Sequence, residues 1–302
     1  TASTILVTAD VVSMYTNIDN KDGLMAVKSL FEKHRDPSRP DHYILELLRI
    51  CLENNDFLFD GQFWLQISGT AMGKIFAPSY ANLFMAWVEE RFFAHIGYRP
   101  PFYARFLDDI FLVWTEGLSL LRLFIAEFDQ AHPSIKLEWT LSREHITFLD
   151  LTIFKDLSIP SPRALCTRVH FKPTNTLRLL HKHSFHPIHT FRGIILGQLS
   201  RFYRLCTYPK DFQKAYRFLF AALRGMRYSR RFLQYCLLDF RKSLNTDRQV
   251  KQDNRKLIPL IFTYHQKSEL ICNNLVTDIW KTLYYNPVVL SGPGVATGTW
   301  VI

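Results

Sequence analysis

The stretch YARFLDDIFLVW, residues 103–114, places two adjacent carboxylates between two apolar runs. The flanking runs are rich in aromatic and branched residues, which is typical of buried strands. We therefore expect a β-hairpin with Asp108 and Asp109 at its tip. Two carboxylates this close repel one another unless a cation lies between them, and their hard oxygen atoms suit Mg²⁺. The stretch predicts a metal site, although a pair of aspartates also occurs by chance in many chains.

A second apolar strand brings another carboxylate. Residues 4–12, TILVTADVV, form a β-branched run that contains Asp10, and Tyr15 follows five residues later. Two strands that bring carboxylates to one edge of a sheet can hold two metal ions about 3.5–4 Å apart, which stabilises both oxygens of a phosphoryl transfer. The alternative for Asp10 alone is a helix cap or a turn residue.

A glycine-containing loop lies between the two acidic strands. Residues 69–78, GTAMGKIFAP, lead into a helix that should start near Pro78. Glycines allow the backbone to approach a base or a sugar-phosphate closely. The alternative is a packing loop before the helix.

The remaining pattern predicts an α+β fold, because helices and an antiparallel-looking sheet alternate without regular βαβ repetition. A hairpin should turn at Asp60-Gly61. The expected helices cover residues 20–34, 41–52, 78–92 and 117–132, and further strands cover 135–141, 146–154 and 165–171.

From about Thr190 the pattern changes to three amphipathic helices with arginine-rich outer faces, over residues 191–206, 210–226 and 229–244. Residues 1–162 contain 14 Lys and Arg against 21 Asp and Glu, whereas residues 163–258 contain 21 against 4. This basic block suggests a polyanion as partner, most often nucleic acid. The alternative is a solvated helical surface, but such surfaces normally mix both signs.

The overall composition is that of a globular protein, with 302 residues, 48% hydrophobic and 21% charged. No apolar run approaches the roughly 18 residues of a transmembrane helix, so no membrane partner is expected. The five cysteines are scattered, which favours reduced core thiols in an intracellular protein. Because the chain does not begin with Met, we expect a missing upstream part.

These motifs in this order resemble the palm of reverse transcriptases. Residues 10–18 resemble motif A, residues 69–82 motif B, and RFLDDIF the acidic box of motif C. More closely, the chain resembles the polymerases of Penelope-like retroelements, relatives of telomerase reverse transcriptase. The segments that carry this resemblance are DVVSMYTNI, GTAMGKIFAPSYANLFM, FLDLTIF, FKPTNTLRLLHKHSFHP and IPLIFTYHQ, and they extend from residue 5 to about residue 287.

The resemblance implies an α+β right-hand polymerase palm followed by a basic all-helical, helix-turn-helix-like thumb. The palm would cover residues 1–160, a strand linker and the thumb 161–256, and a connector remnant 257–302. The implied activity is that of a nucleotidyltransferase, the RNA-directed DNA polymerase of a retrotransposon. Its partners would be an RNA template, a DNA primer and deoxynucleoside triphosphates, and its location the nucleus.

The resemblance also implies residue roles. Asp10, Asp108 and Asp109 would be the catalytic ligands of two Mg²⁺ ions, which Mn²⁺ could replace. Tyr15 would screen the sugar 2′ position. The other nucleotide contacts would be Val11, Met72 and Gly73. The nucleic acid would be held by Lys74, Arg192, Arg201, Arg204, Arg217, Arg224, Arg227, Arg230 and Arg231.

Departures from the family pattern leave alternatives open. Phe106 replaces the usual Tyr of the acidic box, and the finger motifs and the GIY-YIG endonuclease are missing. We therefore expect a truncated copy, and a catalytically dead or domesticated nucleic-acid-binding remnant is the second hypothesis. A palm-fold nucleotidyl cyclase shares the metal chemistry but does not explain the basic helices. Lys136 matches either the proton-donating lysine of motif D or an ordinary solvated lysine.

Overall fold

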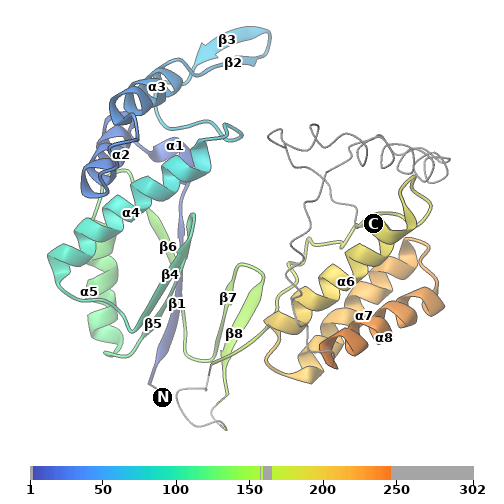
Figure 1. Ribbon diagram of the computed structural model, residues 1–302. Coiled ribbons are helices and arrows are strands. Elements are labelled where there is room, and N and C mark those ends of the chain that lie inside the picture. Colours follow the sequence, from blue (N-terminus) through green and yellow to red (C-terminus); the bar gives the residue numbers. More distant parts are fainter. Residues whose placement is uncertain (1–2, 157, 159–164, 246–302) are drawn as a thin grey trace. The chain divides into compact units, whose positions relative to one another are not determined.

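The computed structural model describes residues 3–156, 158 and 165–245. The chain forms two compact units, of which unit 1 ends at Lys172 and unit 2 begins at Pro173 (Figure 1). The connector remnant expected over residues 257–302 lies outside the described residues, as does the thumb beyond residue 245.

Unit 1 is built around a four-stranded antiparallel sheet. Its strands are β4 (Phe102–Phe106), β5 (Asp109–Trp114), β1 (Ile5–Val11) and β6 (Leu137–Ser142), in that spatial order. Helices α4 (Ala77–Ile96) and α5 (Leu118–Phe128) cover one face (Figure 1). Alternate strand residues such as Val7, Ile110 and Leu112 pack there against Phe92 and Phe124, and all five are buried. Side chains alternate between the two faces along each strand, so the apolar residues of β1 and β5 that point to this face form the main core.

The opposite face of this sheet packs on a three-stranded sheet. Strands β7 (His145–Phe148), β8 (Leu151–Lys155) and β9 (Leu165–Val169) form it, and Ile146 and Ile153 contact Leu6 and Phe111. The prediction of one strand over residues 146–154 was wrong, because this segment makes a hairpin. Leu149 has a positive φ of 53°, and the two-residue loop Leu149–Asp150 reverses the chain.

The other helices of unit 1 build a second core with α4. Helix α2 (Asn20–Lys33) begins after Asp19, whose carboxylate accepts hydrogen bonds from the amides of Lys21 and Asp22 at 2.9 and 3.1 Å. Helices α1 (Met14–Asn17) and α3 (Asp41–Glu53) complete this group. Its buried apolar residues include Met14, Val27, Leu52 and Phe84.

The hairpin predicted at Asp60-Gly61 is confirmed. Strands β2 (Asp56–Phe59) and β3 (Gln62–Leu65) pair across these two residues, whose φ angles of 49° and 72° match a type I′ turn. All residues of both strands are exposed.

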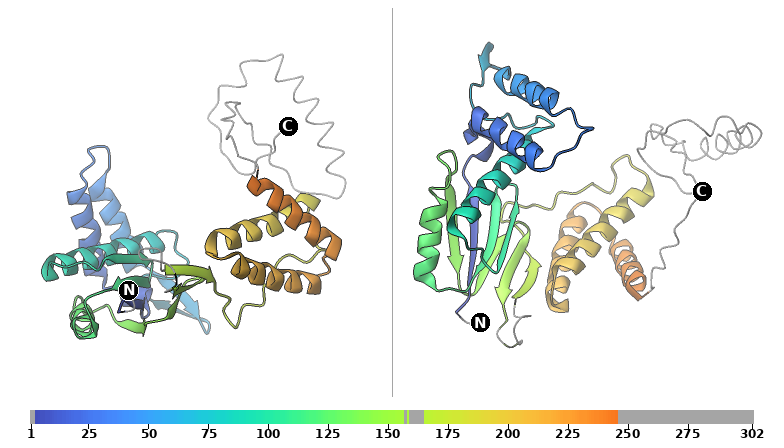
Figure 2. Two further views of the ribbon diagram at one scale, coloured as in Figure 1. Left: turned by 90° about the horizontal axis from the view of Figure 1, so that it is seen from below. Right: turned by 60° about the vertical axis from the view of Figure 1, so that its left-hand side comes forward.

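Unit 2 contains the three predicted helices, α6 (Ile188–Leu205), α7 (Pro209–Gly225) and α8 (Arg230–Asn245) (Figure 2). Helix α6 contacts both α7 and α8. Buried apolar residues recur at helical spacing, for example Phe191, Ile195, Leu199 and Phe202 on α6. In the described part of the chain, no helix combines the length and the apolar character needed to span a membrane.

Candidate functional site

The predicted carboxylates lie at one end of the four-stranded sheet. Asp10 near the end of β1 is the direct cross-strand partner of Asp109, the first residue of β5. On its other side Asp10 faces Glu138 of β6, and Asp109 faces Phe106 of β4. Directly opposed residues of antiparallel strands share a face, with their Cβ atoms about 4.5–5.5 Å apart. The register therefore creates a row of Phe106, Asp109, Asp10 and Glu138, which we call the acidic row.

Asp108 occupies the hairpin turn beside this row. Leu107 and Asp108 form a two-residue loop, and Leu107 has a positive φ of 55°. The backbone carbonyl of Asp108 accepts a hydrogen bond from the amide of Val11 at 3.1 Å. The turn is thus tied to β1 directly after Asp10. Of the two residues expected at the hairpin tip, only Asp108 lies in the loop, and Asp109 begins the strand.

Burial and like charge raise the pKa values of two carboxyl groups in the acidic row, those of Asp109 and Asp10. The pKa of Asp109 is raised, first by partial burial and then by the negative charges of Asp108 and Asp10, while Lys172 opposes this effect. The pKa of Asp10 is raised by partial burial and by Asp108 and Glu138, although the residue as a whole is exposed. A cation bound here would relieve this repulsion.

The chemistry of this carboxylate set fits a divalent cation, but the protein ligands do not form a complete shell. Within the described part of the chain, no three His, Cys, Asp or Glu side chains are grouped so that they could hold a metal ion. An ion at the acidic row would take its other ligands from water and from substrate phosphates, as Mg²⁺ usually does. The metal-binding roles of Asp10, Asp108 and Asp109 stay predictions.

The glycine loop lies against the segment that follows Asp10. The amide of Thr70 donates to the carbonyl of Tyr15 at 2.7 Å, and the amide of Gly69 donates to the carbonyl of Ile18 at 3.1 Å. Gly69 has a φ of 74°, and a Cβ atom there would lie 2.6 Å from the carbonyl oxygens of Tyr15 and Thr16. Sequence reasoning singled out Gly73 but missed the tighter constraint at Gly69, which is the first glycine of the same loop.

The residues near the glycine loop that were predicted to contact the nucleotide differ in how exposed they are. Met72 is 75% exposed, and Gly73, with a φ of 97°, has open space beside it. Tyr15 is half-buried against the second core. The side chain of Val11 is buried there, and its backbone amide donates to the carbonyl of Asp108.

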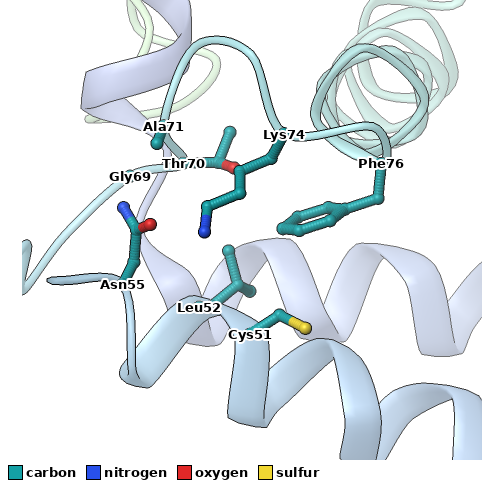
Figure 3. A pocket seen from close by; sticks show the side chains of 8 residues that line it. All are labelled: Cys51, Leu52, Asn55, Gly69, Thr70, Ala71, Lys74 and Phe76. Atoms are coloured by element: carbon teal, nitrogen blue, oxygen red, sulfur yellow. The ribbon is translucent and has the colours of Figure 1, made fainter. Parts of the chain in front are cut away.

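Lys74, the basic residue of the loop, borders a small pocket. Figure 3 shows its side chain turned toward Leu52 and Asn55, with Thr70 beside it and Phe76 on the other side.

Cys51, from the end of α3, also lines this pocket and is exposed, so the prediction of a core thiol was wrong for this cysteine.

The arginines predicted to bind nucleic acid are all exposed on unit 2. Arg192 forms an ion pair with Asp239 at 2.6 Å, and Arg224 donates to the carbonyl of Tyr228 at 2.8 Å. Helix α8 begins with Arg230 and Arg231 and has no acidic residue in its first turn.

The helical spacing of Phe202, Tyr203 and Tyr216 favours core positions over base stacking, and two of the three are in the core of unit 2. Phe202 is 2% and Tyr216 8% exposed, whereas Tyr203 is 48% exposed. Of these three residues, Tyr203 keeps a surface that a base could reach.

Comparisons with known proteins agree with this architecture. Residues 178–237, which span helix α6, helix α7 and half of α8, match the family model of the animal helix-turn-helix domain. No curated protein matches the chain.

Solved structures with a similar fold are polymerases. The telomerase of Candida albicans, solved with a fragment of telomeric RNA, is 10% identical with a TM-score of 0.55, and the match covers 80% of this chain and 40% of that one. The RNA-dependent RNA polymerase of a human picorbirnavirus is 13% identical with a TM-score of 0.51, covering 81% and 45%. Its insertion-loop deletion mutant is 12% identical with a TM-score of 0.53, covering 80% and 46%.

The chain thus spans less than half the length of each of these three polymerases. At this level of identity the likeness concerns the fold. The chain has an α+β fold with antiparallel sheets and packed helices, similar to the palm and thumb folds of telomerase and viral RNA-dependent polymerases.

Proposed function

We propose that this chain is the palm and thumb part of an RNA-directed DNA polymerase, which transfers a deoxynucleotide to the 3′ hydroxyl of a primer. The Penelope-like retroelement is the proposed origin, and the nucleus the proposed location. The observation that carries the proposal is the pairing of Asp10 with Asp109 beside the Asp108 turn, on a sheet whose fold is shared with polymerases.

The acidic row provides the required negative charge at a solvent-accessible edge. Asp10 and Asp109 belong to neighbouring strands whose ladder holds them opposite one another, so their Cα atoms cannot separate without loss of strand pairing. The pKa values of both groups are raised, first by partial burial and then by the neighbouring negative charges. Divalent ions bound there would neutralise charge on the transferred phosphoryl group.

The neighbouring loop and aromatic residues would select and place the nucleotide. The carbonyl of Tyr15 accepts a hydrogen bond from the amide of Thr70, which ties the segment after Asp10 to the glycine loop. The proposed role of the Tyr15 ring is to screen the sugar 2′ position. Met72 and Gly73 are exposed on the same loop and are available for a base or template contact.

The test is primer extension on an RNA template by the full chain, with Mg²⁺ and deoxynucleoside triphosphates. We expect Asp108→Asn to reduce extension at least about 1,000-fold, because metal-ion charge stabilisation supplies several kcal/mol. The matched control is Asp150→Asn, which alters the corresponding residue of the other hairpin turn. Extension by Asp108→Asn at the wild-type rate would refute the assignment.

A second candidate function is nucleic-acid binding without synthesis. The match of residues 178–237 to a helix-turn-helix family and the exposed arginines favour it specifically. Duplex binding that depends on salt, together with no extension by the wild-type chain, would select this candidate over the polymerase.

Arg230 and Arg231 allow binding to be separated from folding. Cations at a helix N-terminus oppose the helix dipole, so replacing both with Gln should raise the free energy of unfolding by about 0.3–1 kcal/mol per residue. The same change should weaken binding of a primer–template duplex and lower its salt slope by about 2. The control is Arg122→Gln, which removes an exposed arginine of α5 that has no predicted contact with nucleic acid. An unchanged salt slope would contradict a phosphate-binding role for Arg230 and Arg231.

A further inference from the structure

Arg105 on β4 has a complete set of hydrogen-bond partners around the turn that carries Asp108. Its Nε and Nη2 atoms bind the two carboxylate oxygens of Glu89 at 2.7 and 3.2 Å. Its Nη1 atom binds Asn82 Oδ1 at 2.8 Å and the carbonyl of Leu107 at 2.9 Å. Nη2 also reaches the carbonyl of Asn82 at 3.3 Å. All five N–H donors of the guanidinium group can therefore be used.

This arrangement is buried and linked to helix α4. The side chains of Arg105 and Glu89 are 9% and 12% exposed, and Tyr103 also donates to Glu89 at 2.6 Å. Glu89 and Asn82 both belong to α4, which lies against this face of the sheet (Figure 1). Helix α4 starts directly after the glycine loop, so Arg105 connects the acidic turn to the element that follows that loop.

The second hairpin turn of unit 1 shows that Arg105 is not needed to form such a turn. Phe148, Leu149 and Asp150 repeat the order of Phe106, Leu107 and Asp108, and Leu149 and Leu107 have φ angles of 53° and 55°. The residue that corresponds to Arg105 is Thr147, which is exposed. The turn therefore forms without an arginine, and the buried guanidinium must have another effect.

That effect follows from the carbonyl groups on both sides of the Asp108 side chain. Arg105 binds the carbonyl of Leu107, and the amide of Val11 binds the carbonyl of Asp108. One contact ties the turn to α4 and the other ties it to β1. Together they fix the peptide groups that determine where the Asp108 side chain leaves the backbone.

We propose that Arg105 is a positioning residue, which holds the Leu107–Asp108 turn against α4 and so places the carboxylates of Asp108 and Asp109 for nucleotidyl transfer. This inference rests on the proposed function for its chemical consequence, but the structural part can be tested independently. Lysine cannot replace Arg105, because a single ammonium group cannot reach the carbonyl of Leu107, Asn82 and both oxygens of Glu89 together.

The structural test is amide hydrogen exchange by NMR in Arg105→Lys. Arg105→Lys removes the hydrogen bond from the guanidinium group to the carbonyl of Leu107 and so loosens the turn to which the amide of Val11 is bound. We therefore expect the amide of Val11 to exchange about tenfold faster, which corresponds to the loss of one hydrogen bond from a charged donor. The amide of His170, which binds the carbonyl of Asp150 in the second turn at 2.8 Å, is the internal control and should keep its rate. Arg122→Lys, at an exposed arginine of α5, is the control variant. If Val11 and His170 change together, or neither changes, the proposal is overturned.

The functional test is steady-state primer extension. Arg105→Lys should lower kcat by about 10–100-fold with little change in KM for the nucleotide, since small displacements of reacting groups can cost about 100-fold. Faster exchange at Val11 with unchanged kcat would overturn the catalytic consequence. If the wild-type chain does not extend primers, the proposed function fails, and the exchange experiment alone decides whether Arg105 holds the turn.

A second variant guards against misfolding of Arg105→Lys. Asn82 is exposed, so Asn82→Ala removes one anchor of Arg105 and leaves its ion pair with Glu89 in place. It should change Val11 exchange and kcat in the same direction but by a smaller factor. No selective change at Val11 in this variant would also count against the proposal.

Discussion

Unit 1 contains the same type of hairpin turn twice, at Phe106-Leu107-Asp108 and at Phe148-Leu149-Asp150. Both leucines have a positive φ, and both aspartates accept an amide hydrogen bond from a neighbouring segment, from Val11 at 3.1 Å and from His170 at 2.8 Å. The backbone of the two turns is therefore nearly equivalent. A Phe-Leu-Asp turn alone does not make a chemical site.

The turns differ in the residue that follows and in its cross-strand partner. Asp109 follows the first turn and faces Asp10, whereas Leu151 follows the second and faces Val169. An opposed pair of carboxylates is unfavourable for stability, while an apolar pair belongs to ordinary sheet packing. The feature that distinguishes the first turn is therefore the carboxylate pair next to it, more than Asp108 itself.

The largest effect is expected when the residue after the first turn is replaced by leucine, the residue that follows the second turn. Asp109→Leu should reduce primer extension at least about 1,000-fold, because it removes one carboxylate of the pair that would hold the metal. The free energy of unfolding should stay equal or rise, because like charge is removed from a partly buried position. Primer extension and thermal unfolding measure the two effects. Retained extension would show that the pairing is not the catalytic feature.

The glycine loop adds a second constraint near the first turn, because it binds the segment after Asp10. Gly69→Ala should lower the free energy of unfolding by about 2 kcal/mol, because the new Cβ would meet two carbonyl oxygens that the backbone fixes. Gly61→Ala is the matched control, since Gly61 has a similar φ of 72° with nothing within 4 Å of an added Cβ. Urea unfolding measures both variants. Equal losses would mean that φ alone, and not the close approach, constrains Gly69.

The smallest expected effect concerns pH. The pKa of Asp109 is raised in the folded chain, so the folded chain binds a proton there more tightly than the unfolded chain does. Protonation of Asp109 therefore stabilises the fold below about pH 3.8, the ordinary pKa of an aspartate. This stabilisation is lost as the pH rises through the pKa that Asp109 has in the folded chain. Without divalent ions at pH 7, Asp109→Asn should therefore be more stable than the wild type. Solvent screening limits the difference to less than about 1 kcal/mol.

Unfolding measured from pH 3 to pH 8 checks this sign. The difference between wild type and Asp109→Asn should shrink on acidification, and added Mg²⁺ at pH 7 should reduce it by stabilising the wild type. A variant that is less stable than the wild type at pH 7 would contradict the repulsion inferred for the acidic row.

Local sequence patterns predicted much of the fold. The Asp60-Gly61 turn, the helix after the glycine loop and the three basic helices of unit 2 occur where the pattern indicated. These features depend on residues close together in the chain, through turn chemistry and helical periodicity. The hairpin inside residues 146–154 was missed, because its turn has no glycine or asparagine and no second carboxylate like Asp109 to mark it.

For the candidate site, the candidate residues could be read from the sequence alone: Asp10, Asp108 and Asp109 in the acidic part of the chain, and the arginines of the basic helices. The folded chain was needed to show that Asp10 pairs with Asp109, that Glu138 joins the row, and that Arg105 binds the carbonyl of Leu107. The reason is strand register. Asp10 and Asp109 are far apart in the chain, and a slip of one residue in the pairing of β1 with β5 would move one of them to the other face.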